Sequence, residues 1–244
     1  MSEETNTLDP TATPVKSERT FARFSLTERW EHALFLLTFG VLLLTGLPQK
    51  YRAAEWSQYL LSTPRRLEFI QTIHHIAALI LLAETIFHLG RGLIRLSQRR
   101  LNGAMLPTWQ DVRDAFAMLR YLLFLDRKKP SFGKFSFEQK FTYWFFIFGT
   151  LIMIGSGLVI WFPITFTRIL PGGIIPAAKL AHSAEAIAAA IFVLMWHSYH
   201  VHVERLNLSI FTGRLSEREM HEYHQREYER LTSPTPDESP GEGA

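Results

Sequence analysis

The sequence of 244 residues contains no cysteine. This absence excludes disulfides, cysteine-ligated iron–sulfur clusters, thiol catalysis and covalent haem attachment through a C-x-x-C-H motif. Any redox cofactor must therefore be held without covalent attachment, by His, Met or carboxylate side chains.

Several functional motifs are also missing. The sequence has no Walker A loop, dinucleotide-binding fingerprint, G-x-S-x-G or H-E-x-x-H, so nothing indicates hydrolysis or nucleotide chemistry. The first 25 residues are polar and contain no apolar core, and we expect no secretory signal there. We find no internal repeat of fixed period and no sign of a nucleic-acid partner.

Hydrophobic residues make up 47% of the chain and gather in four stretches. These are residues 27–47, 70–93, 143–162 and 177–203. The third has no charged residue, and its length matches the roughly 20 residues that a helix needs to cross a bilayer. Tryptophans at the ends of stretches resemble interfacial anchors; they are Trp30, Trp144, Trp161 and Trp196. Although buried helices of a soluble protein are the alternative, the pattern favours an all-α integral membrane four-helix bundle.

The distribution of basic residues predicts the orientation of this bundle. Of the 26 Lys and Arg residues, 20 lie before the first stretch or in its first turn, between the last turn of the second stretch and the start of the third, or after the fourth. The other six lie in the two remaining loops, of about 22 and 18 residues, and at the start of the fourth stretch. The positive-inside rule then places both termini in the cytoplasm.

The polar parts of the chain are of two kinds. Residues 1–19 and 232–244 are rich in Ser, Thr, Pro and acidic residues and are expected to be disordered tails around a membrane domain of residues 20–231. Between the second and third stretches, apolar residues recur at helical spacing from Trp109 to Leu123. This spacing predicts an amphipathic helix on the inner membrane face. The alternative is a short cytoplasmic helix packed on the rest of the protein.

Eight of the ten histidines lie in or at the ends of the apolar stretches, where ionisable groups are costly unless they pair or bind a cofactor. His182 and His197 are 15 residues apart, which on an α-helix separates them by about 22 Å along the axis and by about 60° in direction around it. His74 and His88, 14 residues apart, are separated by about 21 Å and about 40°. His32 adds an imidazole at the inner level.

Haem iron takes two axial ligands on opposite sides of a flat ring, and a helix bundle supplies them from facing helices. The simplest arrangement pairs His74 with His182 near the outer surface. It pairs His32 with His197 near the inner surface. Two stacked b haems would result.

Three histidines leave alternatives open. His88 could replace His32, and His200, almost at the azimuth of His182, could replace His197. His88 with His200 or His202 could also hold a third haem or line a quinone pocket. Zinc is a weaker rival because its sites need clustered ligands. Haem-free alternatives are a proton relay or transporter that uses Glu84, Glu185 and the histidines, and a non-redox scaffold.

The chain resembles the bacterial membrane-bound di-haem cytochrome b family, which includes the formate dehydrogenase gamma subunit, the cytochrome b subunit of nickel–iron hydrogenase and the thiosulfate reductase cytochrome b. The resemblance covers about residues 20–230. The matching segments are R-F-S-L-T-E-R-W-E-H with L-L-L-T-G-L-P (23–48), I-H (73–74), E-Q-K-F-T-Y-W (138–144), G-L-V-I-W-F-P (157–163), A-H-S-A-E-A (181–186) and W-H-S-Y-H (196–200).

This resemblance implies a subunit of a respiratory oxidoreductase in a bacterial inner membrane, rather than a stand-alone enzyme. Its four haem ligands would be His32, His74, His182 and His197. Electrons would pass between the membrane quinone and an iron–sulfur or multihaem subunit on the periplasmic side. Whether this chain also forms a homo-oligomer is left open. We expect the quinone near the inner haem, with candidate residues Glu28, Arg29, Glu31 and Lys140.

Overall fold

The computed structural model describes residues 19–99, 103–204 and 206–233. Its four long segments are α1 (Leu26–Lys50), α3 (Pro64–Ser97), α5 (Phe137–Trp161) and α7 (Ile174–Phe192), the last continued by the π-helices η2 (Val193–His197) and η3 (Tyr199–Val203). Each is long and apolar enough to cross a membrane. The predicted all-α bundle of four membrane helices is confirmed.

Local sequence signals set where these helices begin. Ser25 forms a capping box with Glu28 at the start of α1, and Ser136 caps α5 in the same way. Thr63 caps α3, whose first residue is Pro64. Such side chains satisfy the free N–H groups of a first helical turn. The helices consequently begin outside the apolar stretches and are longer than them.

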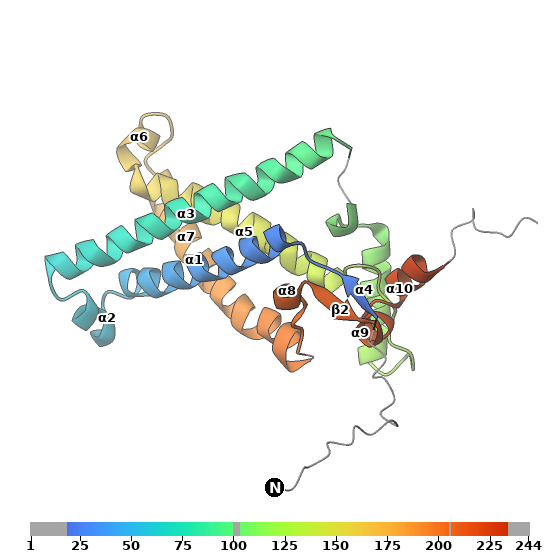
Figure 1. Ribbon diagram of the computed structural model, residues 1–244. Coiled ribbons are helices and arrows are strands. Elements are labelled where there is room, and N and C mark those ends of the chain that lie inside the picture. Colours follow the sequence, from blue (N-terminus) through green and yellow to red (C-terminus); the bar gives the residue numbers. More distant parts are fainter. Residues whose placement is uncertain (1–18, 100–102, 205, 234–244) are drawn as a thin grey trace, which may run out of the picture.

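The bundle consists of two helix pairs, in which α1 packs on α3 and α5 packs on α7 (Figure 1). Its buried positions are mostly small or polar; examples are Thr38, Ala77, Gly149, Ser156 and Ala189. Large apolar side chains point outward, and Leu44 and Leu194 are each more than 70% exposed. Small residues inside and large apolar residues outside are expected of helices that pack within lipid.

Short elements lie at the two ends of the bundle (Figure 1). The loop end carries α2 (Glu55–Leu60) and α6 (Pro163–Thr167). The opposite end, here called the sheet end, carries β1 (Thr20–Ala22), η1 (Gly103–Met105), α4 (Trp109–Leu122), α8 (Ser209–Thr212), β2 (Arg214–Ser216), α9 (Glu217–Tyr223) and α10 (Gln225–Thr232). The predicted amphipathic segment is therefore a helix, α4.

A two-stranded antiparallel sheet, which we did not predict, joins the two ends of the described chain. Phe21 of β1 pairs with Leu215 of β2, and both pack on Met220. Just before β2, Gly213 has a φ of +76°, and a Cβ there would lie 2.9 Å from the Phe24 carbonyl oxygen. Only glycine fits this turn without strain. The predicted disordered tails lie almost wholly outside the described residues.

Candidate cofactor site

The structure brings four of the predicted histidines together as two facing pairs inside the bundle. The ring centroids of His32 on α1 and His197 on η2 are 6.3 Å apart. Those of His74 on α3 and His182 on α7 are 6.4 Å apart. All four side chains are half-buried.

These separations fit two imidazoles bound to one metal ion from opposite sides. A metal–imidazole bond is about 2.0–2.1 Å, and a ring nitrogen lies about 1.2 Å from its ring centroid. Two such rings on either side of one ion therefore have centroids about 6.4–6.6 Å apart. Each pair thus leaves room for the iron of a haem, which takes its axial ligands in this way.

The two pairs occupy different levels of the bundle. His182 precedes His197 by 15 residues along one helical segment, a rise of about 22 Å on an α-helix. His74 lies ten residues after α3 begins at the loop end. The His74–His182 pair, here the loop-end pair, is therefore the outer pair of the sequence prediction, and His32–His197 is the sheet-end pair.

A hydroxyl group and a glycine on α1 hold His74. The Thr45 hydroxyl donates to the Val41 carbonyl at 2.7 Å and lies 2.9 Å from His74 Nδ1. Because its one proton is used on Val41, the hydroxyl accepts from Nδ1–H, which leaves Nε2 free for a metal. A Cβ on Gly46 would lie 3.3 Å from His74 Cε1, so glycine gives the imidazole its space.

The same arrangement recurs on α5 around His182. His182 Nδ1 lies 3.1 Å from the Met153 carbonyl and 3.1 Å from the Ser156 hydroxyl. A carbonyl only accepts, so Nδ1 carries the proton and Nε2 is again the free nitrogen. A Cβ on Gly157 would lie 3.2 Å from His182 Cε1. Hydrogen bonds of this kind fix the tautomer and orientation of metal-ligating imidazoles.

The sheet-end pair is built differently. In the part of the chain that the structure describes, neither the His32 imidazole nor the His197 imidazole has a hydrogen-bond partner. Phe146 of α5 instead meets His197 edge-on, with ring centroids 6.5 Å apart. His197 ends the π-helix η2, and π-helical turns occur frequently at functional sites. Both ring nitrogens of each imidazole are therefore available to a ligand.

His88 lies apart from the two pairs, in a polar cluster that joins α1, α3 and α5. Its Nδ1 is 3.1 Å from Glu31 Oε2, and its Nε2 is 3.0 Å from the Tyr143 hydroxyl. Arg91 also donates to Glu31 Oε2, at 2.7 Å. Because both ring nitrogens have protein partners, this geometry does not favour His88 as a metal ligand. We call Glu31, His88, Arg91 and Tyr143 the polar cluster.

The remaining candidate histidines lie near the end of η3. His200 Nδ1 is 2.7 Å from Glu204, which also pairs with Lys129 at 3.1 Å. His202 is exposed. His75 of α3 stacks on Trp161 of α5 with ring centroids 4.1 Å apart.

The four quinone candidates have different surroundings. Glu31 belongs to the polar cluster and directly precedes His32 in the sequence. Glu28 caps α1 by accepting from Ser25. Arg29 donates to the Phe211 carbonyl. Lys140 is paired with Asp111 at 2.9 Å and donates to the Leu106 carbonyl.

The two intramembrane carboxylates also differ in their surroundings. Glu84 is buried on α3, one turn from His88, and its Oε2 has no hydrogen-bond partner among the described residues. Glu185 packs on Gly149 of α5, where a Cβ would lie 2.4 Å from its Oε1. Among the described residues, no group of three or more His, Asp or Glu side chains forms a metal cage, as zinc would require.

Three supporting residues escaped the sequence analysis. Thr45 and Ser156 each precede a glycine that packs on a histidine, and Tyr143 contacts His88. The pairing of a hydroxyl residue with glycine, T-G in one helix and S-G in another, is the only sequence signal for Thr45 and Ser156. It becomes informative only once α1 is known to face His74 and α5 to face His182.

Comparison with known families gives one match. Residues 23–213, more than half of the chain, match the family described as prokaryotic cytochrome b561. A comparison with curated proteins finds no match. The matched region contains all four membrane helices and both histidine pairs, whose geometry fits haem. The chain therefore belongs to the prokaryotic cytochrome b561 family, and is a haem b membrane electron-transfer protein.

Proposed function

We propose that this cytochrome holds two b haems and passes electrons between the membrane quinone and a partner redox subunit. The observation that carries this proposal is the presence of two facing imidazole pairs at two levels of one bundle. His74 and His182 would hold one haem, and His32 and His197 the other. A haem-free proton relay is not favoured, because membership of a cytochrome b family implies haem b.

Each bound haem would supply one-electron exchange between ferric and ferrous iron. The residues of the chain have other tasks. Thr45, Ser156 and the Met153 carbonyl orient the loop-end imidazoles, while Gly46 and Gly157 leave space beside them. Because α7 and η2 carry one ligand of each pair, a single helical segment fixes the spacing between the two sites.

The quinone is proposed to react at the sheet end, beside His32. Quinone reduction and oxidation move protons together with electrons, so the site needs groups that accept and release protons. Glu31 and His88 are such groups, and Arg91 and Tyr143 hold them by hydrogen bonds. Of the four quinone candidates, Glu31 is the one placed among other titratable groups inside the bundle.

The partner is proposed to bind at the loop end. The loop-end pair lies near α2 and α6, so an iron–sulfur or multihaem subunit bound there would be close to His74 and His182. This placement corresponds to the periplasmic face if the basic sheet end is cytoplasmic, as the positive-inside rule predicts. The chain would then be an inner-membrane subunit of a respiratory oxidoreductase complex.

The number of haems is the first test. Protein purified in detergent from haem-replete cells should contain two b haems per chain in the pyridine haemochromogen assay. His182→Ala should remove the loop-end haem and His197→Ala the sheet-end haem, leaving one haem in each variant. Full haem content in either variant would overturn the ligand assignment, and three haems in the wild type would bring His88, His200 or His202 into it.

The quinone site needs a separate test. In Glu31→Gln, a short-chain quinol should reduce the haems at least tenfold more slowly, while dithionite should still reduce both completely. The matched control is Glu68→Gln, which removes an exposed carboxylate of α3 at the loop end and should react like the wild type. Unchanged quinol kinetics in Glu31→Gln would exclude Glu31 from the site without affecting the haem assignment.

A further inference from the structure

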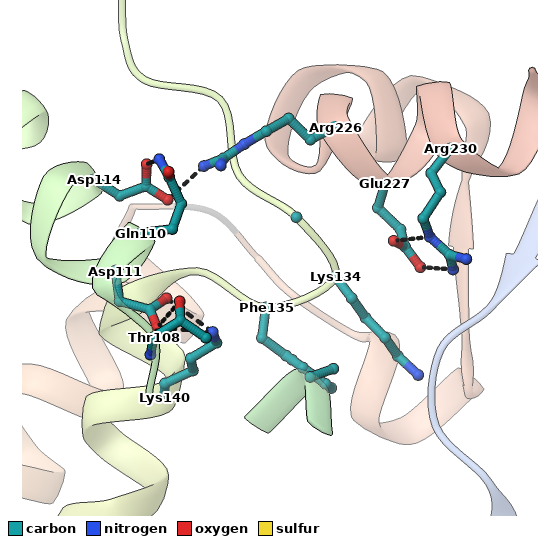
Figure 2. A pocket seen from close by; sticks show the side chains of 12 residues that line it. Thr108, Gln110, Asp111, Asp114, Lys134, Phe135, Lys140, Arg226, Glu227 and Arg230 are labelled. Carbon is teal, nitrogen blue, oxygen red and sulfur yellow. Dashed lines mark hydrogen bonds and ion pairs between the residues drawn. The ribbon is translucent and has the colours of Figure 1, made fainter. Parts of the chain in front are cut away.

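Two adjoining hollows lie between α4 and the rest of the sheet end. The first is a polar cavity of about 400 Å³, shown in Figure 2, between the N-terminal part of α4, the segment 133–135 and α10. The second is an apolar groove of about 450 Å³ between α4 and the start of α5. Asp111 and Lys140 line both hollows, so their ion pair forms the boundary between them.

The polar cavity has one more cation than anions in its lining. Three ion pairs account for most of the charge: Lys140 with Asp111, Arg226 with Asp114, and Arg230 with Glu227. Lys134 is the fourth cation and makes no ion pair within the described residues. Its ammonium lies 5.5 Å from the Phe135 ring centroid, and its side chain extends away from Asp111 and Asp114 (Figure 2). An anionic group would complete the charge balance.

The groove is lined by the apolar face of α4 and by aromatic residues of α5. Val112, Phe116 and Leu119 lie on one side, and Phe141 and Trp144 on the other. Apart from the Lys140–Asp111 boundary, these walls offer a ligand only apolar contacts. This apolar lining fits a hydrocarbon chain.

The position of α4 places the groove at the membrane surface. Trp109 is 70% exposed and Phe116 64% exposed, both on the apolar face of α4. Their exposure is expected where lipid covers an amphipathic helix lying in the interface. The groove wall on α5 belongs to the first turns of a membrane helix, beside Trp144, a residue type enriched at the bilayer interface. The polar cavity is therefore next to lipid headgroups and the groove next to acyl chains.

We propose that these two hollows together bind one anionic phospholipid. Its phosphate lies in the polar cavity near Lys134, and one acyl chain lies in the groove against Phe116 and Phe141. A free phosphate ion would use only the cavity, and a zwitterionic lipid would bring a cationic headgroup to Lys134. Basic pockets on the cytoplasmic side of membrane helices are suited to anionic headgroups in this way. The proposal is independent of the haem ligands and of the quinone site.

Native mass spectrometry of the full-length, haem-loaded protein in detergent tests the proposal. After titration with phosphatidylglycerol, phosphatidylcholine or inorganic phosphate, the wild type should retain one phosphatidylglycerol and neither of the others. Lys134→Gln should weaken retention about fivefold, the effect of one basic residue near a membrane surface. Ala115→Trp, which fills the groove, should weaken it at least tenfold.

Matched controls identify effects that are not specific to the site. Lys179→Gln removes an exposed cation at the start of α7, and Leu122→Trp adds an indole to α4 outside the groove; both should retain the lipid like the wild type. The haem spectrum of every variant reports whether its bundle is intact. Equal retention of phosphatidylcholine, binding of inorganic phosphate alone, or unchanged retention in both Lys134→Gln and Ala115→Trp would overturn the proposal.

Discussion

Replacing Gly46 by valine should weaken the loop-end haem site without unfolding the bundle. A Cβ at this position would lie 3.3 Å from His74 Cε1 and 3.8 Å from His74 Nδ1. Since carbon atoms pack best at about 3.5–4.0 Å, the imidazole would have to move by about 0.2–0.7 Å. Such a shift would also disturb the 2.9 Å contact between Nδ1 and Thr45.

The size of the effect follows from overpacking. Extra methyl groups in a well-packed site cost about 1–3 kcal/mol. A cost of about 2 kcal/mol corresponds to a roughly 30-fold weaker haem affinity at the loop-end pair. Gly40 supplies the matched control, because it lies on the same helix and a Cβ there meets nothing within 4 Å. Both variants change helix propensity equally, so their difference measures the contact with His74.

The assay is the haem-to-protein ratio after purification, followed by a redox titration of the haem absorbance. The haem content of Gly46→Val should fall towards one per chain, and its redox titration should lose one component. Gly40→Val should keep two haems and both components. Gly157→Val and its neighbour Gly155→Val form a second comparison at His182, since a Cβ on Gly155 also meets nothing. Two haems with unaltered potentials in both Gly46→Val and Gly157→Val would refute the reasoning.

Three further predictions concern the polar cluster and the sheet end. His88→Gln should leave the haem content unchanged, because both ring nitrogens have protein partners; loss of a haem would make His88 a ligand. Burial raises the pKa of the Asp111 carboxyl, but hydrogen bonds from Lys140 and its helix cap outweigh this and lower the pKa below its usual range. Its ion pair with Lys140 therefore stabilises α4 above about pH 4 and loses this effect as pH falls through the lowered pKa. In the wild type, limited proteolysis of α4 should become faster as the pH falls through this lowered pKa. Asp111→Asn should abolish that pH dependence. Gly213→Ala should destabilise the sheet end by about 1–2 kcal/mol, the cost of a left-handed residue, with added strain from the Phe24 carbonyl; an unchanged thermal midpoint would contradict this.

Most of the bundle could be predicted from the sequence because the bilayer imposes long apolar helices. The stretch 143–162 has no charged residue, and its length alone identifies a membrane helix. The helix ends were less predictable, since capping residues such as Ser136 extend α5 into polar sequence. The β1–β2 pair was missed because each strand has three residues, too few for an alternating pattern to be recognised.

The sequence analysis paired His32 with His197 but kept His200 as an alternative, because ideal helix geometry alone could not decide between the two. On an ideal α-helix His200 lies closest to the azimuth of His182, whereas His197 is turned by about 60°. The segment Val193–His197 is instead a π-helix, whose longer i→i+5 turns rotate the chain by fewer degrees per residue. His197 is thereby turned back towards the direction of His182 and meets His32. Nothing in the local sequence announces this change of helix type.

The two histidine pairs are equivalent in spacing but not in support, and this difference follows from which helices face them. Each loop-end imidazole lies against a neighbouring helix that offers a hydroxyl followed by glycine, Thr45–Gly46 or Ser156–Gly157. The glycine lets the ring approach, and the hydroxyl or a nearby carbonyl then fixes its Nδ1. At the sheet end Phe146 of α5 contacts His197 edge-on instead. The loop-end pair is therefore held by directional hydrogen bonds, whereas the described residues give the imidazoles of the sheet-end pair, next to the polar cluster, no such bond.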